Sequence, residues 1–135
     1  MYKKLITLAA TVPLLLFLAA GLAHAGKHDP IYVPQPIQVP AGKGAGDVKN
    51  VIKKALFEKN WEVREIGSGH IQGKYTKSGK HTAVIDIKYD AKTVSINYKD
   101  SENLNYNKDN NTIHGTYNNW VRNVEKNIRS GLGAY

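Results

Sequence analysis

Three histidines, His70, His81 and His114, are the side chains of this chain best suited to acid–base or metal chemistry. An imidazole exchanges a proton near neutral pH, and its neutral form is a common metal ligand. No two of these histidines share a short metal motif such as H-x-x-x-H, so they can cooperate only if the fold brings them together. With Asp86 or Asp100 as an acidic partner, they define one hypothesis, a histidine-based metal-binding protein or hydrolase.

Other residue types make no positive case for an enzyme. The chain contains no cysteine, which excludes thiolate chemistry and disulfides. Its serines lack the strand–turn–helix setting of a nucleophile elbow, and no glycine-rich phosphate loop is present. We therefore favour a protein without catalytic residues, cofactor or dedicated metal site.

The spacing of apolar residues predicts the elements that would position these side chains. Residues 80–100 hold two runs of alternating apolar and polar residues joined by a short polar turn, which predicts an antiparallel hairpin with one buried face. Runs at 61–66 and 70–77 predict two earlier strands, with turns at Gly67–Gly69 and Ser78-Gly79. Strands joined by such short turns pair antiparallel, because parallel pairing needs a long crossover.

Two amphipathic helices flank these strands. The first is expected to begin near Asp47 and to end at Asn60, a residue that tolerates the left-handed conformation. The second is expected to begin at Thr112 and to end at Gly131 and Gly133, with an apolar stripe at helical spacing. The prediction is an α+β fold with the order α-β-β-β-β-α, a four-stranded antiparallel meander with both helices packed on one face.

Three segments follow one another along the chain. Residues 1–25 combine basic Lys3 and Lys4, a long apolar run and the ending Ala23-His24-Ala25, which predicts a signal peptide cleaved after Ala25. An uncleaved anchor helix is the alternative. Residues 26–46 contain four prolines and predict an extended linker, although its apolar residues could also dock as an edge strand. Residues 47–135 then form a single α+β domain.

The net charge and the predicted export together restrict which partners are expected. The chain carries 19 Lys and Arg against 11 Asp and Glu, a net charge of +8. Since most of the cations are lysine, diffuse attraction to an anionic surface is favoured over shaped bidentate recognition. The expected partner is an envelope protein or an anionic envelope component of the periplasm. We expect no nucleic acid and no membrane span after signal cleavage, and the oligomeric state is left open.

Aromatic residues offer a further reading. Tyr75, Tyr89 and Tyr98 fall on predicted strands, and Trp120 falls on the last helix. Such side chains have an apolar body and a polar tip, so they could line a binding groove. The alternative is that they fill a small core whose margins are wet.

The C-terminal half carries a specific pattern, D-S-x-N-L-x-Y at residues 100–106 and I-H-x-x-Y-N-x-W-V at residues 113–121. With the run IDIKYD at 85–90, it resembles a family of uncharacterised small exported proteins and lipoproteins of proteobacteria, over about residues 48–128. The family supplies no activity. Many of its members carry a lipobox cysteine that this chain lacks, so lipid anchoring is not implied.

The resemblance directs attention to polar residues around one loop-to-helix junction. Asp and Asn side chains can hold an irregular loop by bonding backbone amides, but such a cluster could equally present a ligand site. We predict an exported periplasmic, non-enzymatic binding or accessory domain for an envelope component or protein partner. Its candidate binding residues are Asp100, Ser101, Asn103, Tyr106, His114, Tyr117 and Asn118.

Overall fold

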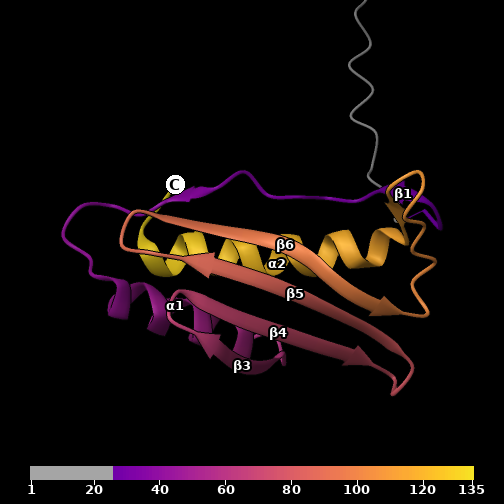
Figure 1. The fold of residues 1–135 in the computed structure, drawn as a ribbon, viewed down its shortest axis with the longest axis horizontal. Helices are drawn as coiled ribbons and strands as arrows, with labels where there is room; N and C mark the ends of the chain where they lie inside the picture. The colour runs from indigo at the N-terminus through magenta and orange to yellow at the C-terminus, as the bar shows by residue number, and fades with distance from the viewer. Residues whose placement is uncertain (1–25) are drawn as a thin grey trace, which may run out of the picture.

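The computed structural model describes residues 26–135, which form a five-stranded antiparallel sheet, a two-stranded sheet and two helices. Both helices lie behind the larger sheet in Figure 1 and leave its other face uncovered. The predicted signal peptide, residues 1–25, lies outside the described residues. The elements in chain order are β1 (Asp29–Pro30), β2 (Ile37–Gln38), α1 (Ala45–Phe57), β3 (Glu62–Gly67), β4 (His70–Lys77), β5 (His81–Tyr89), β6 (Thr93–Glu102), β7 (Thr112–Ile113) and α2 (Gly115–Leu132).

The predicted alternation at the centre of the sheet decides which face meets the helices. Ile85 and Ile87 of β5 are fully buried, and so are Val94 and Ile96 of β6. The residues between them on each strand point to the uncovered face, because successive side chains of a strand alternate. The core is therefore one apolar layer between this face of the sheet and the two helices.

The four-stranded meander predicted from the sequence is wrong. The larger sheet has the order β2-β6-β5-β4-β3, because β2 pairs antiparallel with the outer edge of β6 through Ile37 and Val94. A second pair, β1 with β7, joins Asp29 to Ile113. Prolines hold both N-terminal strands to two residues, and such short strands are tolerated at sheet edges. Because the segment is rich in proline, its sequence predicts a linker, and the two short strands are not recognisable in it.

The segment before α1 docks along the rest of the chain. In Figure 1 it runs beside α2 from β1 to β2 before turning down to α1. Tyr32 makes much of this contact, since its hydroxyl donates to Glu125 Oε1 at 2.6 Å and Arg122 lies 4.3 Å from its ring centre. Ile37 is 0% exposed and belongs to the main core. Residues 26–46 therefore contribute to the core and close one edge of the sheet.

The helix boundaries differ from the expected ones at three of four ends, and only the end of α2, with Gly133 as its C-cap, agrees. Helix α1 begins at Ala45, and Asp47 acts in its first turn by accepting from the Gly44 amide at 2.9 Å. Helix α1 ends at Phe57 rather than at the expected Asn60, although Asn60 does adopt the predicted left-handed conformation, with φ 62°. Thr112 lies in β7, and α2 begins only at Gly115 with His114 as its N-cap. This shift makes His114 part of the helix boundary.

The two helices meet closely near the end of α2. A Cβ added to Gly131 would lie 2.7 Å from Val51 Cγ1 on α1, so only glycine allows this approach. Within residues 26–135, no helix has the length and apolar character needed to cross a membrane.

Candidate binding site

The fold separates the three histidines of the metal or hydrolase hypothesis. His70 pairs in register with Lys88, on the uncovered face of the sheet, and its Nε2 lies 2.7 Å from Asp86 Oδ1. His81 lies on the same face of β5 as Ala83 and Ile85, which is the face that the helices cover. Within residues 26–135, no three His, Asp or Glu side chains gather closely enough to hold a metal ion. His81 and His114 do come together, without His70.

Asp86 stabilises the uncovered face through its side-chain partners. Burial raises its pKa, but hydrogen bonds from His70 and Gln72 and the nearby charge of Lys99 lower it, and the net pKa lies below the ordinary value. A depressed pKa contributes stability above the unfolded-state pKa of about 3.9, and that contribution is lost as the pH falls through the folded-state value.

Asp86→Asn is therefore expected to lower the free energy of unfolding at pH 7 by about 1 kcal/mol. The difference from the wild type should shrink below about pH 4, because the wild-type carboxylate then takes up a proton. Urea denaturation at a series of pH values measures both effects. The exposed Asp109→Asn is the matched control, and equal losses in the two variants would contradict the role of Asp86.

His81 and His114 line one cavity at the end of the domain, here called the histidine pocket. Its volume is about 240 Å³. The turn between β4 and β5 forms one wall, the loop after β6 forms the second, and the first turns of α2 form the third. The lining residues are Lys77, Ser78, His81, Asn103, Leu104, His114, Thr116 and Trp120.

Backbone hydrogen bonds assign opposite tautomers to the two imidazoles. His81 Nδ1 lies 2.8 Å from the Asn103 carbonyl oxygen, which can only accept, so Nδ1 carries the proton. His114 Nδ1 accepts from the Thr116 amide at 3.1 Å, as an N-cap does, so the proton of its neutral form is on Nε2. Neither Nε2 is an unpartnered buried atom among the described residues. With these tautomers, Nε2 is an acceptor in His81 and a donor in the neutral form of His114, and both residues line the pocket.

Hydrogen bonds to backbone carbonyls tie together the segments that carry the two imidazoles. Asn103 Nδ2 donates to the Lys80 carbonyl at 2.8 Å, which ties the loop after β6 to the β4–β5 turn. One residue later, the Leu104 carbonyl accepts from the His114 amide at 2.7 Å, which ties the same loop to the start of α2. Asn103 itself has φ 55°, a left-handed value that asparagine adopts more readily than most residues. The asparagine-rich loop is thus an ordered part of the pocket wall.

Trp120 reaches the pocket because aromatic packing supports it from beneath. Its ring meets Tyr75 edge to face with centroids 4.8 Å apart, and Tyr75 in turn lies 5.5 Å from the ring of Trp61. Trp61 is buried in the core. This row of rings fixes Trp120 as a rigid apolar wall for a ligand.

A second hollow adjoins the pocket, here called the tyrosine hollow. It has a volume of about 530 Å³ and shares Asn103 and Leu104 with the histidine pocket. The rings of Tyr98 and Tyr106 stack in its wall with centroids 4.3 Å apart, and Tyr106 is 39% exposed. The lining residues are Tyr98, Lys99, Asp100, Ser101, Asn103, Leu104, Asn105 and Tyr106.

A β-bulge shapes this hollow. Val84 pairs with Asp100 and Ile85 with Tyr98, so Lys99 is an extra residue in β6. The bulge places Tyr98 and Ser101 on the same face, and their hydroxyls lie 2.8 Å apart. Burial raises the pKa of Tyr98, a rise that the bond with Ser101 partly offsets and the charge of Asp100 reinforces. The phenol therefore stays protonated and available as a hydrogen-bonding group at neutral pH.

Five of the seven predicted binding residues line these two cavities. Asp100, Ser101, Asn103 and Tyr106 line the tyrosine hollow, while His114 and again Asn103 line the histidine pocket.

The other two predicted residues, Tyr117 and Asn118, are buried in the core. Burial raises the pKa of the Tyr117 phenol. Asn118 bonds the backbone of the N-terminal segment. Their roles in the described structure are therefore contacts within the fold.

The predicted binding residues included only Asn103 and His114 of the histidine pocket and omitted its other lining residues, among them His81, Trp120 and Lys77. His81 had entered only the metal hypothesis, and Trp120 only the set of aromatic residues that could line a groove. The β4–β5 turn and the start of α2 are far apart in sequence, and only the pairing of the strands brings them together. No signal in the sequence alone would place them side by side.

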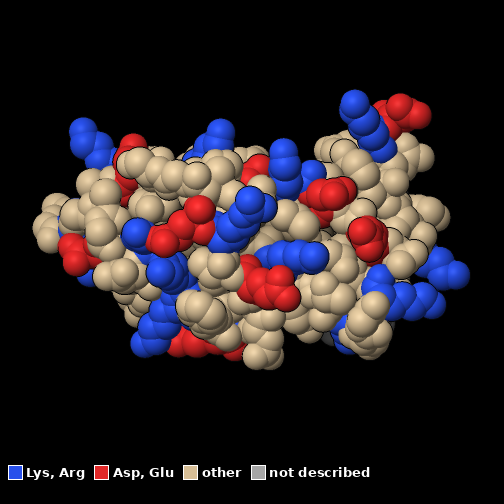
Figure 2. Space-filling model, turned by 60° about the horizontal axis from the view of Figure 1, so that its bottom comes forward, with Lys and Arg blue, Asp and Glu red and all other residues tan. Residues whose placement is uncertain are grey.

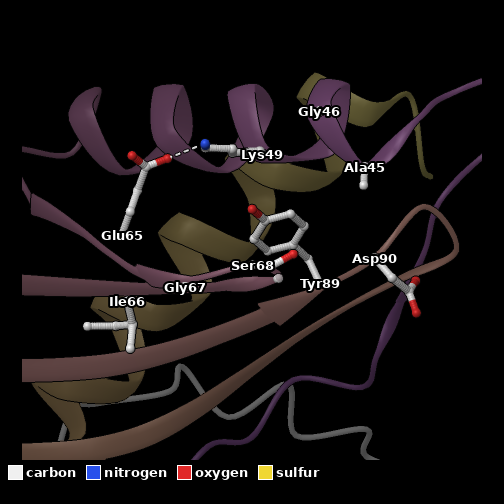
Figure 3. A pocket seen from close by; sticks show the side chains of 10 residues that line it. Ala45, Gly46, Lys49, Glu65, Ile66, Gly67, Ser68, Tyr89 and Asp90 are labelled. Atoms are coloured by element: carbon white, nitrogen blue, oxygen red, sulfur yellow. Dashed lines mark ion pairs between the residues drawn. The ribbon is translucent and has the colours of Figure 1, made fainter.

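Another hollow, of about 570 Å³, lies between the start of α1, the β3–β4 turn and the end of β5. Figure 3 shows Lys49 pointing at Glu65 across it, with their charged atoms 2.5 Å apart. The hydrogen bond between the two side chains, together with their opposite charges, raises the pKa of Lys49 and lowers that of Glu65. Because these two charged groups already bond each other, they are less available to bind a ligand than the side chains of the histidine pocket.

Positive charge does not gather into one field on the face that Figure 2 shows. Lys and Arg side chains alternate there with Asp and Glu across the surface. The ion pairs of the structure show the same mixing of charges, since Glu65 pairs with both Lys49 and Lys53. On this face, the excess of lysine in the sequence therefore does not mark a docking surface.

Comparison with known proteins finds no matching protein family, no matching curated protein and no matching solved structure.

Proposed function

We propose that this chain is an exported, non-enzymatic binding domain that captures a component of the bacterial envelope at the histidine pocket. The observation that carries the proposal is the pair of imidazoles, His81 and His114, fixed in opposite tautomers beside Trp120. Fixed polar groups on an apolar wall are the usual composition of a ligand site. Export and the envelope setting rest on the signal peptide predicted at residues 1–25.

The tautomers favour binding over metal chemistry at this pair. A metal bound at His114 Nε2 would require the proton to move to Nδ1, which would break the bond that caps α2. His81 alone has the arrangement of a metal ligand, with Nδ1 donating to a backbone carbonyl. One ligand does not make a metal site, whereas one donor and one acceptor can hold an organic group.

The test is co-sedimentation of the protein, purified from cells expressing the full chain, with isolated cell envelopes. His81→Ala and His114→Asn are each expected to weaken binding about tenfold, the effect of one lost hydrogen bond of about 1.4 kcal/mol. Asparagine is among the best N-cap residues, so His114→Asn keeps the cap of α2 while removing the imidazole. Its melting temperature should stay near that of the wild type.

The exposed His28→Ala is the matched control and should sediment like the wild type. If the two pocket variants also bind envelopes as the wild type does, the histidine pocket is not the binding site.

A further inference from the structure

The tautomers of the two histidines restrict the kind of group that the histidine pocket can bind. A group bonded to Nε2 of both neutral imidazoles donates to His81 and accepts from His114. A carboxylate or a fully ionised phosphate has no proton to give to His81, and an ammonium accepts nothing from His114. A hydroxyl or a secondary amide does both. Its oxygen can also accept from the ammonium of Lys77, which lines the same pocket, so a group with both hydrogen-bonding roles fits this lining best.

The size and walls of the pocket restrict its shape. About 240 Å³ is below the range of roughly 300–1,000 Å³ typical of a site for a whole drug-sized ligand, so the pocket holds one ring-sized unit. Trp120 and the buried Leu104 supply apolar surface, while the imidazoles supply polar contacts. A sugar ring matches this division, because its C–H groups form an apolar face and its hydroxyls lie at the edge.

The tyrosine hollow repeats the same design beside the pocket. It too combines an aromatic wall, the stacked Tyr98 and Tyr106, with small polar side chains such as Ser101. The two cavities share Asn103 and Leu104. Two adjoining sites with the same composition suit a polymer that repeats the same ring. The charged residues lining the hollow, Lys99 and Asp100, are of opposite sign and do not call for a charged polymer.

We propose that the ligand of the binding domain is a glycan chain of uncharged sugar units, with one ring in the histidine pocket and the next in the tyrosine hollow. This inference rests on the proposed function and names its ligand class. Recurring peptide-recognition modes use a strand edge, a helix groove or an extended polyproline groove, and a pocket for a single ring resembles none of them.

The test is NMR titration of protein purified from cells expressing the full chain, followed through the indole N–H signals of Trp120 and Trp61. The probes are a tetramer of N-acetylglucosamine, a tetramer of glucose, their monosaccharides, and acetyl-glycyl-glycine methylamide as a peptide mimic. At least one tetramer should shift Trp120, while Trp61, buried in the core, serves as the internal reference. If both tetramers shift Trp120, the pocket recognises a sugar hydroxyl. If only the N-acetylglucosamine tetramer does so, the pocket recognises the acetamido group.

The Tyr106→Ala variant distinguishes binding in the tyrosine hollow from binding in the histidine pocket. It should lower the affinity for the responding tetramer about tenfold and leave the affinity for the monosaccharide unchanged, because only the longer chain reaches the hollow. Tyr106→Phe keeps the stacked ring and should restore tetramer binding. His81→Ala should lower the affinity for both the tetramer and the monosaccharide.

Two outcomes would overturn the glycan proposal. One is a shift of Trp120 by the peptide mimic and by neither tetramer, which would make the ligand a peptide. The other is no shift of Trp120 by any sugar at millimolar concentration. In both cases the envelope sedimentation of the pocket variants still decides the proposed function, so failure of the ligand class and failure of the binding site are distinguishable.

Discussion

Replacing Ile37 by alanine is expected to lower the free energy of unfolding by about 2–5 kcal/mol, the usual cost of truncating a fully buried Ile. Ile37 is 0% exposed, pairs with Val94 at the edge of the larger sheet and belongs to the main core. The variant loses the transfer free energy of the removed methyl and methylene groups and leaves a cavity that the two-residue strand β2 can fill only in part. Equilibrium urea denaturation measures the loss.

Val33→Ala is the matched control, since Val33 lies in the same proline-containing segment but is 50% exposed. Its expected effect is within about 0.5 kcal/mol of the wild type, as for surface substitutions in general. If Ile37→Ala is equally mild, residues 26–46 act only as a tether and the five-stranded sheet does not form in solution.

Asn118→Ala is expected to cost about 2–4 kcal/mol, because it removes two hydrogen bonds to backbone groups of the N-terminal segment at once. Asn118 is 4% exposed. Its Oδ1 accepts from the Tyr32 amide at 2.8 Å, and its Nδ2 donates to the Pro30 carbonyl at 2.9 Å. Alanine leaves both backbone groups without a partner unless the segment detaches. Amide hydrogen exchange of Tyr32 should therefore speed up together with the loss of stability.

The neighbouring Asn119→Ala provides the control, because Asn119 lies on the exposed side of α2. It should leave both the free energy of unfolding and the Tyr32 exchange rate close to those of the wild type. A stable Asn118→Ala variant with a protected Tyr32 amide, but with weakened envelope binding, would instead assign Asn118 to the ligand site.

The residue types in the sequence identified several residues of the candidate site but did not predict how they are arranged in space. The pattern at residues 100–118 directed attention to the loop that lines the histidine pocket, since Asn103 and His114 are both lining residues. The pattern did not separate buried members such as Asn118 from lining members, because an Asn on a helix reads the same whether it meets solvent or a backbone. His81 and Trp120 complete the pocket only through the pairing of β4 with β5 and the packing of α2.

The sequence by itself determined the elements with strong local periodicity. The alternation in β5 and β6 decided which side chains are buried, because in a strand the period of two leaves one register that buries Ile85 and Ile96 together. The left-handed Asn60 after α1 likewise follows from local backbone preference. These features depend on neighbours along the chain.

Only the tertiary structure decided the number of strands and the composition of the site. Strands β1 and β2 are two residues long, too short for any periodicity, and they exist because β7 and β6 offer unpaired edges. The Thr116 amide sets the tautomer of His114 locally, but the tautomer of His81 depends on the carbonyl of Asn103 in a distant loop, and only the fold brings both imidazoles to one pocket. Hydrogen bonds between distant segments leave no periodic signature, so the part of the molecule proposed to bind its ligand is the part that the sequence alone could not assemble.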